Sequence, residues 1–278
     1  MNRKVDVKVN GYQTTDGAGV KLVRVLGIKT TDKYDPILML DSFDSENPDD
    51  YTAGFPDHPH RGIETISYLS KGKMTHKDSM GNEDTITDGE IQWMTAGSGI
   101  IHSESLPASE RLLGVQLWLN LPKKDKMVSP NYHAVRNHEI PEIEIDGGKL
   151  RLLVGDYLDH SGYKGDYLPL DYYDIHLEKG GKFSIDLKED KSISLFTLVG
   201  SIIVEDTLVE EKTAAKLTQG DKLEFTACED CQVLFISSDK LEEPISWGGP
   251  IVMNTKEELD LAFRELKIGK FIKEEVDY

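Results

Sequence analysis

The stretch that decides the fold of this chain is HPHRGIETISYL, residues 58–69. It begins with two histidines separated by one residue, His58 and His60, and continues into residues 63–69, where apolar and polar residues alternate. This alternation, together with many strand-forming residues, predicts a β-strand. Residues i and i+2 of an extended strand point to the same face, so we expect the two imidazoles to share one side of the chain.

A second pair of ligand-type side chains follows at His102 and Glu104, again with one residue between them. Short strand-like segments separated by turn residues connect the two pairs, which predicts a small antiparallel barrel. A barrel wall would bring the pairs together although they are distant in sequence. Three imidazoles and one carboxylate would then face a common point, an arrangement that suits a divalent transition metal and leaves coordination positions open.

The predicted ligand set contains no thiolate, which argues against a cysteine-based structural zinc site. Iron(II) is the metal that we expect, because open sites of nitrogen and oxygen ligands suit it. Zinc, manganese, nickel, cobalt and copper remain alternatives. Glu104 has a possible double role, as a metal ligand and as the acceptor of a proton from a substrate hydroxyl.

Several further residues are candidates for the surroundings of this site. Glu64 is expected to lie near the metal, to orient a histidine, or to face solvent. Gln116, Trp118 and Trp93 are candidates for the wall of a pocket. The remaining histidines are interpreted as surface or satisfied core residues: His76, His133, His138, His160 and His176.

The chain divides into two predicted domains. The buried strand expected at 112–121 is followed by a polar break, so we predict a metal-binding barrel at 1–130 and a second barrel, without a metal site, at 131–278. A helix is expected after Asn254, because Thr255 and Glu258 have the spacing of a capping box. Gly269 is its expected end. Strands in the second domain are predicted at 150–154, 172–177, 194–199, 201–204, 222–225 and 232–237.

Composition limits the possible functions. The chain has 278 residues, 38% of them hydrophobic, and a formal net charge of −18. This acidity argues against direct binding to nucleic acid and against docking to anionic membranes. We see no secretory signal and no run of membrane-spanning length, so a cytoplasmic protein is expected. The two cysteines, Cys228 and Cys231, are interpreted as ordinary thiols in a turn.

Four segments together resemble the pirin family. They are residues 55–69, 89–104, 114–122 and 249–255. The resemblance implies an all-β fold of two cupin (jelly-roll-like) β-barrels with a short C-terminal helix, and a metal in the N-terminal barrel. It places the family's three histidines and one glutamate on His58, His60, His102 and Glu104, with iron as the usual metal.

The resemblance implies two functions of different kinds. Some pirins cleave quercetin, a flavonol, with dioxygen and release carbon monoxide, whereas eukaryotic members act as iron-dependent co-regulators of transcription. We therefore expect a dioxygenase that takes a small aromatic substrate and dioxygen. The alternative is a non-enzymatic, redox-sensing protein whose protein partner is unknown. A sugar isomerase is a weaker hypothesis, because Arg61 alone offers little to bind a phosphate.

Overall fold

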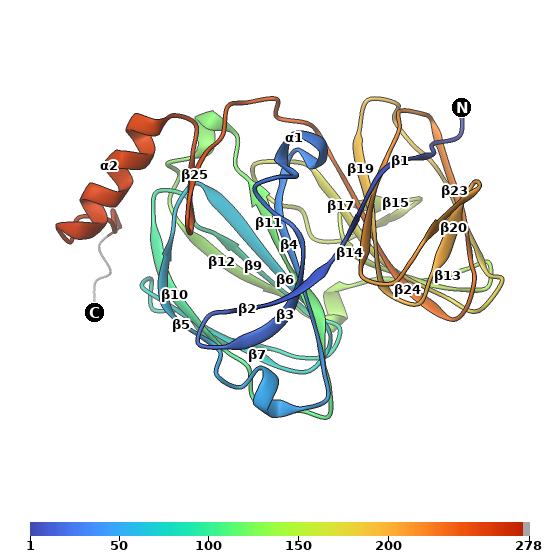
Figure 1. Ribbon diagram of the computed structural model, residues 1–278, viewed down its shortest axis with the longest axis horizontal. Helices are drawn as coiled ribbons and strands as arrows, with labels where there is room; N and C mark the ends of the chain where they lie inside the picture. The colour runs from blue at the N-terminus through green and yellow to red at the C-terminus, as the bar shows by residue number, and fades with distance from the viewer. Residues whose placement is uncertain (275–278) are drawn as a thin grey trace. The chain divides into compact units, whose positions relative to one another are not determined.

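Strands make up most of the described chain. The structure is a computed structural model that describes residues 1–274. Its α-helices are short: α1 is Thr31–Tyr34 and α2 is Lys256–Lys267 (Figure 1). The described residues also form three short 3-10 helices, η1 (Pro48–Asp50), η2 (Lys123–Asp125) and η3 (Asn137–Glu139). The prediction of an all-β fold with a short helix near the C-terminus is confirmed.

The predicted metal-binding barrel is built from a seven-stranded and a four-stranded sheet. The larger sheet has the order β12 (Asn131–Val135), β9 (Ile91–Thr95), β6 (Ile63–Lys71), β11 (Leu112–Asn120), β4 (Ile37–Ser45), β3 (Val20–Leu26) and β2 (Tyr12–Asp16). The smaller sheet has the order β5 (Phe55–His60), β10 (Ile100–Ser105), β7 (Met74–Asp78) and β8 (Glu83–Ile86).

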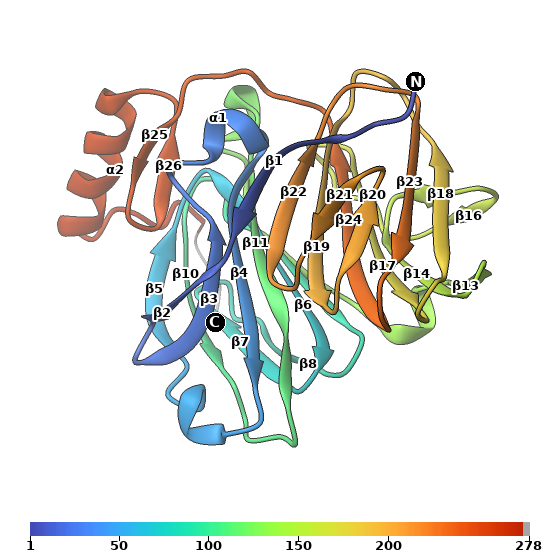
Figure 2. The same ribbon diagram turned by 45° about the vertical axis from the view of Figure 1, so that its right-hand side comes forward.

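The second barrel repeats this plan. Its larger sheet has the order β1 (Val5–Asn10), β22 (Thr213–Leu217), β19 (Ser192–Val199), β24 (Cys231–Ser238), β17 (Leu170–Leu177), β14 (Gly148–Val154) and β13 (Glu142–Ile145). The smaller one has the order β18 (Lys182–Asp186), β23 (Lys222–Ala227), β20 (Ile202–Val204) and β21 (Thr207–Val209). Figure 2 shows β22, β19, β24 and β17 side by side.

Two small hairpins complete the β-structure. They are β15 (Asp156–Tyr157) with β16 (His160–Ser161), and β25 (Ser246–Gly248) with β26 (Ile251–Met253). The capping box is present at the start of α2, where the Thr255 hydroxyl accepts from the Glu258 backbone N–H and the Glu258 carboxylate accepts in return. The helix ends just before Gly269, whose φ of +70° is left-handed. Both predicted ends of the helix are therefore confirmed.

The cores of the barrels explain why the strands form where they do. Every residue of β11 is buried, as expected for the apolar run that ends the first predicted domain. In the second barrel, aromatic rings such as Tyr173, Phe183 and Phe235 lie between the two sheets, each with at most 2% of its surface exposed. Burial of one large apolar side chain contributes about 1.5–3 kcal/mol, so these rings stabilise the barrel strongly.

By contact, the chain groups into two compact units that each use several segments. One contains residues 1–12, 25–36 and 137–240, and the other contains residues 13–24, 37–136 and 241–278. The first strand of the chain, β1, pairs with β22, which explains why the N-terminal segment belongs with the second barrel. The division into domains 1–130 and 131–278 stays a prediction.

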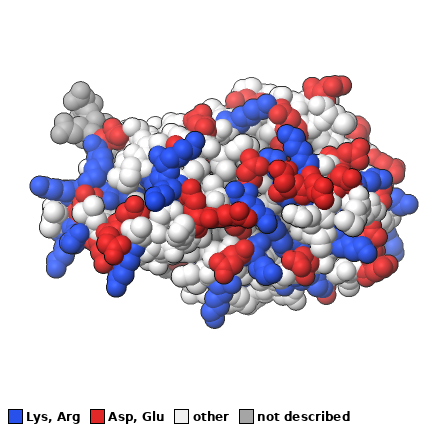
Figure 3. Space-filling view, turned by 90° about the horizontal axis from the view of Figure 1, so that it is seen from above, with Lys and Arg blue, Asp and Glu red and all other residues white. Residues whose placement is uncertain are grey.

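The surface carries both signs of charge. Lys and Arg side chains lie interspersed with Asp and Glu side chains on the face shown in Figure 3. The sequence holds 32 basic and 50 acidic residues, so such mixing accompanies its net charge of −18. No helix within residues 1–274 is long and apolar enough to cross a membrane.

Gly114 marks a close approach between two central strands. It lies in β11, and a Cβ atom at this position would lie 2.2 Å from the backbone oxygen of Tyr68 in β6. β11 is paired on its other side with β4, so it cannot move away from β6 freely. A glycine in a strand often marks such an approach.

Gly114→Ala should therefore lower the free energy of unfolding by about 3 kcal/mol, because the added methyl group forces two paired strands apart. Gly81→Ala is the control, since Gly81 has open space around it and a φ of +86°. It should lose only about 1 kcal/mol from backbone strain. Denaturant unfolding measures both variants, and equal losses would contradict the steric explanation.

Candidate metal centre

Two neighbouring strands bring three predicted ligands together. β5 carries His58 and His60, and β10 carries His102, which lies opposite His58 in the antiparallel pair. The two strands adjoin in the four-stranded sheet (Figure 1). The two-residue spacing of His58 and His60 puts both rings on the face of the sheet that His102 also uses.

The three imidazoles converge on one point. Their ring centroids are 4.8 Å apart for His58 and His60, 4.3 Å for His58 and His102, and 5.1 Å for His60 and His102. One ligand nitrogen from each ring lies within 4.8 Å of the other two. Ligands of one ion at about 2.1 Å are at most about 4.2 Å apart, so small ring rotations would bring all three onto one ion.

Hydrogen bonds to Nδ1 orient two of these rings. The Nδ1 atom of His58 lies 2.8 Å from the carbonyl oxygen of Pro56, and Nδ1 of His60 lies 3.0 Å from the carbonyl oxygen of Pro250. A carbonyl oxygen only accepts, so both Nδ1 atoms carry the proton and donate it. The lone pair of each neutral ring is then on Nε2, which is the form that binds a metal.

His60 and His102 are buried, with 2% and 1% of their surface exposed. Burial lowers the pKa of His60 to about 3, with a smaller effect of His58, and it lowers the pKa of His102 well below its ordinary value. Both rings are therefore neutral at physiological pH. The Nε2 atom of His102 is buried and has no hydrogen-bond partner among the described residues. A buried polar atom without a partner is costly, and a metal ion at this position would satisfy it.

Glu104 lies on β10, two residues after His102, and it is 3% exposed. Its Oε1 atom accepts a hydrogen bond of 2.6 Å from Nε2 of Gln92, and its Oε2 atom accepts one of 2.9 Å from Nε2 of Gln116. Glu104 is not among the residues whose ligand atoms lie within 4.8 Å of one another. Its role as the fourth ligand therefore stays a prediction.

The other side chains considered from the sequence have different positions. Glu64 is buried and accepts hydrogen bonds from the Trp93 indole (2.9 Å) and the Thr95 hydroxyl (2.7 Å), so the interpretation that it faces solvent is wrong. The ring of Trp118 lies edge-on to His60 with centroids 5.0 Å apart. Trp118 therefore packs beside the histidines, whereas Trp93 is bound to Glu64.

His76 contacts one of the predicted metal ligands, which the sequence did not indicate. It is a satisfied core residue, but one of its partners is His102, with Nδ1 atoms 3.2 Å apart. Its other ring nitrogen contacts Asp78. The signal in the sequence is the spacing of His76 and Asp78, which have one residue between them in a predicted barrel strand.

Residues far along the chain hold the strand that carries His60. Arg61 is 2% exposed, and its guanidinium donates to the carbonyl oxygens of Ser98 (2.6 Å) and Phe271 (2.8 Å) and to the carboxylate of Glu265 (2.8 Å). Buried Lys126 donates to the carbonyl oxygens of Gly62 (2.7 Å) and Val252 (3.0 Å). Burial lowers the pKa of Lys126 to about 7.

Comparison with known families decides the identity of the fold. The model of the family described as Pirin matches residues 19–119, and that of the Pirin C-terminal cupin domain matches residues 172–272. The chain belongs to the pirin family. The two cupin barrels expected from the resemblance are thereby confirmed.

Relatives of this pirin-family chain extend over nearly its whole length. A Pseudomonas aeruginosa protein, provisionally named a quercetin 2,3-dioxygenase, is 40% identical over 93% of this chain and 94% of its own. Human pirin is 33% identical over 97% of this chain and 94% of its own. A crystal structure of quercetin 2,3-dioxygenase from Acinetobacter baumannii has a TM-score of 0.90 at 34% identity, covering 98% of this chain and 99% of that one.

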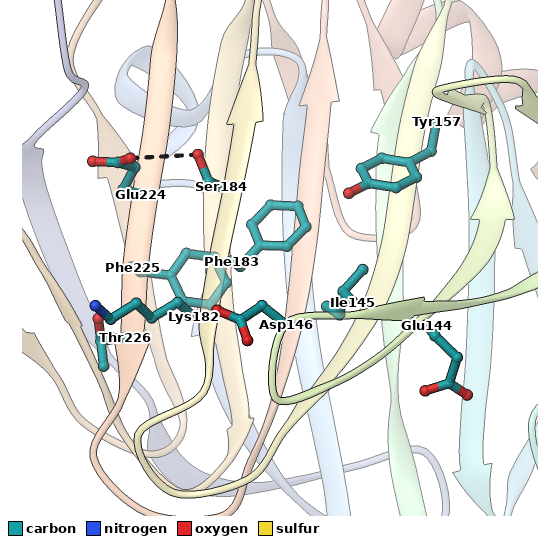
Figure 4. Close-up of a pocket in the computed structure, with 10 residues that line it drawn as sticks. All are labelled: Glu144, Ile145, Asp146, Tyr157, Lys182, Phe183, Ser184, Glu224, Phe225 and Thr226. Atoms are coloured by element: carbon teal, nitrogen blue, oxygen red, sulfur yellow. Dashed lines mark hydrogen bonds between the residues drawn. The ribbon is translucent and has the colours of Figure 1, made fainter.

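The second barrel of this pirin has a pocket of its own, with a volume of about 540 Å³. Figure 4 shows the rings of Tyr157, Phe183 and Phe225 in its wall, and a hydrogen bond between Ser184 and Glu224. Its lining residues include acidic side chains and one lysine but no histidine or cysteine. The imidazoles that converge in the first barrel are therefore not repeated among the residues that line this pocket.

Adding Co(II), Ni(II) or Zn(II) to the metal-free protein should raise the Tm of the barrel that contains the histidines. At a metal concentration 100 times the Kd, the stabilisation should be about 2.7 kcal/mol. His58→Ala should abolish this stabilisation, because it removes one predicted ligand. The His58 ring is half-buried, so its removal leaves no sealed cavity.

His176→Ala is the matched control for that measurement, because His176 belongs to the second barrel and is 35% exposed. It should keep the full shift. A metal-induced shift that persists in His58→Ala would show that the ion binds elsewhere.

Proposed function

We propose that this chain is a metal-dependent dioxygenase that cleaves quercetin or a related enolisable flavonol. The observation that carries the proposal is the convergence of three imidazoles, from His58, His60 and His102, with a buried carboxylate beside them. The names of similar proteins from Acinetobacter baumannii and Pseudomonas aeruginosa support the same reaction.

In this proposal His58, His60, His102 and Glu104 hold the ion. Iron(II) is the preferred metal, and zinc, manganese, nickel, cobalt and copper also suit a site of nitrogen and oxygen ligands. When bound, such an ion supplies a Lewis acid that stabilises an anionic substrate oxygen next to dioxygen. Two of the ligand rings, His60 and His102, are already neutral, so no proton has to leave them when the ion binds.

Glu104 accepts the proton of the substrate hydroxyl. A carboxylate has about four lone-pair positions, and the amides of Gln92 and Gln116 occupy three of them by hydrogen bonds of 2.6, 3.2 and 2.9 Å. One position is left, so Glu104 takes the hydroxyl proton only where it is not bound to the ion. Because both amides come from strands of the larger sheet, they fix the carboxylate relative to the histidines on the smaller sheet.

Trp118 provides an apolar surface for a planar substrate. It is 8% exposed, and its ring lies 5.0 Å from the ring of His60 and 5.8 Å from that of Trp247. The indole Nε1 of Trp118 is itself buried, so the contact offered to a flavonol is the ring and not this N–H.

Loading the protein with Fe(II) without oxygen, adding quercetin and admitting air should remove the quercetin absorbance in an oxygen-dependent way. Glu104→Gln should lower kcat by about 100-fold or more, because the amide cannot take up a proton. Metal content is measured in the same samples.

Glu64→Gln is the control, since it removes another buried carboxylate of the same unit that contacts Trp93 and Thr95. It should keep wild-type turnover. Iron-loaded protein that leaves quercetin unchanged in air would refute the proposed reaction and favour the alternative, an iron-dependent interaction protein. The cytoplasmic location and the absence of nucleic-acid and membrane partners stay predictions.

A further inference from the structure

Three buried side chains form a hydrogen-bonded line that ends at the metal centre. Nε2 of His76 lies 2.8 Å from Oδ2 of Asp78, and Nδ1 of His76 lies 3.2 Å from Nδ1 of His102. The side chains of His76 and Asp78 are 0% exposed. β7 carries both residues and pairs with β10, which sets Asp78 opposite His102. The line is therefore built into the ladder of one sheet.

The chemistry of the partners gives this line a direction. The carboxylate of Asp78 accepts, so Nε2 of His76 carries a proton and donates it. The other nitrogen of a neutral His76 ring then has the lone pair and accepts from Nδ1–H of His102. His102 is left with its lone pair on Nε2, the buried atom that has no partner among the described residues.

The groups around the line hold it in place. Asp78 Oδ1 accepts from the backbone N–H groups of Met80 (2.9 Å) and Asn82 (3.1 Å), and Oδ2 also accepts from the Asn82 amide (2.9 Å). Burial alone would raise the pKa of Asp78, but the hydrogen bonds from His76 and Asn82 outweigh it and lower the pKa. The ring of Tyr132 stacks on His76 at 4.3 Å and 14°. A 180° flip of the His76 ring would break its contacts with Asp78 and His102, and the stacked ring of Tyr132 opposes it.

His102 differs in this respect from the other two histidines of the centre. His58 and His60 give their Nδ1 protons to neutral carbonyl oxygens, whereas Nδ1 of His102 lies against an imidazole backed by a carboxylate. A partner of this kind fixes the ring and increases the basicity of the nitrogen that faces the metal.

We propose that His76 and Asp78 are positioning residues that hold His102 as its Nδ1–H tautomer and make it the strongest donor among the three histidines of the metal centre. The proposal rests on the metal site proposed above but not on the reaction. Neither residue needs to touch the ion or the substrate.

The second barrel offers a matched control. Nε2 of His176 lies 2.8 Å from Oδ2 of Asp174, again with one residue between the two, and the Asp174 side chain is 0% exposed. Gln232 donates to the other oxygen of this carboxylate at 2.8 Å. The same kind of histidine–carboxylate pair thus occurs in β17. That strand belongs to the compact unit that does not contain the group of three histidines.

The first test reads the tautomer directly in metal-free protein. Long-range ¹H–¹⁵N correlation spectra of protein with ¹⁵N-labelled histidine should show His102 protonated at Nδ1 and His76 protonated at Nε2. In His76→Phe, the signal of His102 should change to that of a mixture of tautomers. A wild-type His102 protonated at Nε2 would overturn the proposal.

The second test measures the affinity for Co(II) or Zn(II) by competition with a chelator. His76→Phe keeps a ring to stack on Tyr132 but removes both nitrogens, and it should weaken binding about 10- to 100-fold. His76→Asn offers an oxygen near the position of Nδ1 and should recover most of that loss. His176→Phe should bind like the wild type.

Wild-type affinity in His76→Phe would refute the proposal. An affinity of His76→Asn as low as that of His76→Phe would also refute it. Near-UV circular dichroism checks the fold of each variant. Should His76→Phe not fold, Asp78→Asn replaces it, because an amide NH₂ facing His76 reverses the line and should weaken metal binding about 10- to 100-fold. Wild-type affinity in Asp78→Asn would overturn the proposal equally. Metal-loaded protein that cleaves no quercetin would refute the reaction and leave these measurements valid.

Discussion

The candidate metal centre depends on the partner of the Nδ1 nitrogen in each imidazole. A neutral histidine has one N–H and one lone pair, so a fixed acceptor at Nδ1 leaves Nε2 for the ion. In this chain the three acceptors are the carbonyl oxygen of Pro56, the carbonyl oxygen of Pro250 and the imidazole of His76. Their spacing in sequence ranges from 2 residues for His58 to 190 residues for His60. The site is thus a product of the whole unit and not of one motif.

The sequence predicts the parts of the site that follow from strand periodicity. His58, His60 and His102 converge because side chains two residues apart share a face, and two short strands with such pairs adjoin in one sheet. The capping box of α2 is equally local and equally predictable, since it depends on two residues three positions apart. Short strands and regular turns likewise predict the barrels, whereas the division of each barrel into a seven-stranded and a four-stranded sheet comes from the structure.

Other features depend on pairings that no local pattern specifies. His76 contacts His102 because β7 adjoins β10 on the side away from β5, and that order is a property of the sheet. The burial of Glu64 depends on Trp93 and Thr95 in another strand. Gln92 and Gln116 bind Glu104 across two sheets, whereas the sequence suggests Gln116 only as part of a pocket wall. The two barrels share one architecture, but the convergent histidines belong to the first, in keeping with the rule that function lies in sites and not in folds.

The carbonyl oxygen of Pro250 that orients His60, and the carbonyl oxygen of Phe271 that binds Arg61, have a consequence for biosynthesis. A ribosome makes the histidine strands first and these two residues later. A nascent polypeptide that has just passed His102 already possesses all the imidazoles, yet the ring of His60 still lacks its anchor. The fixed orientation of the His60 ring therefore comes later than the synthesis of the strands that carry the histidines.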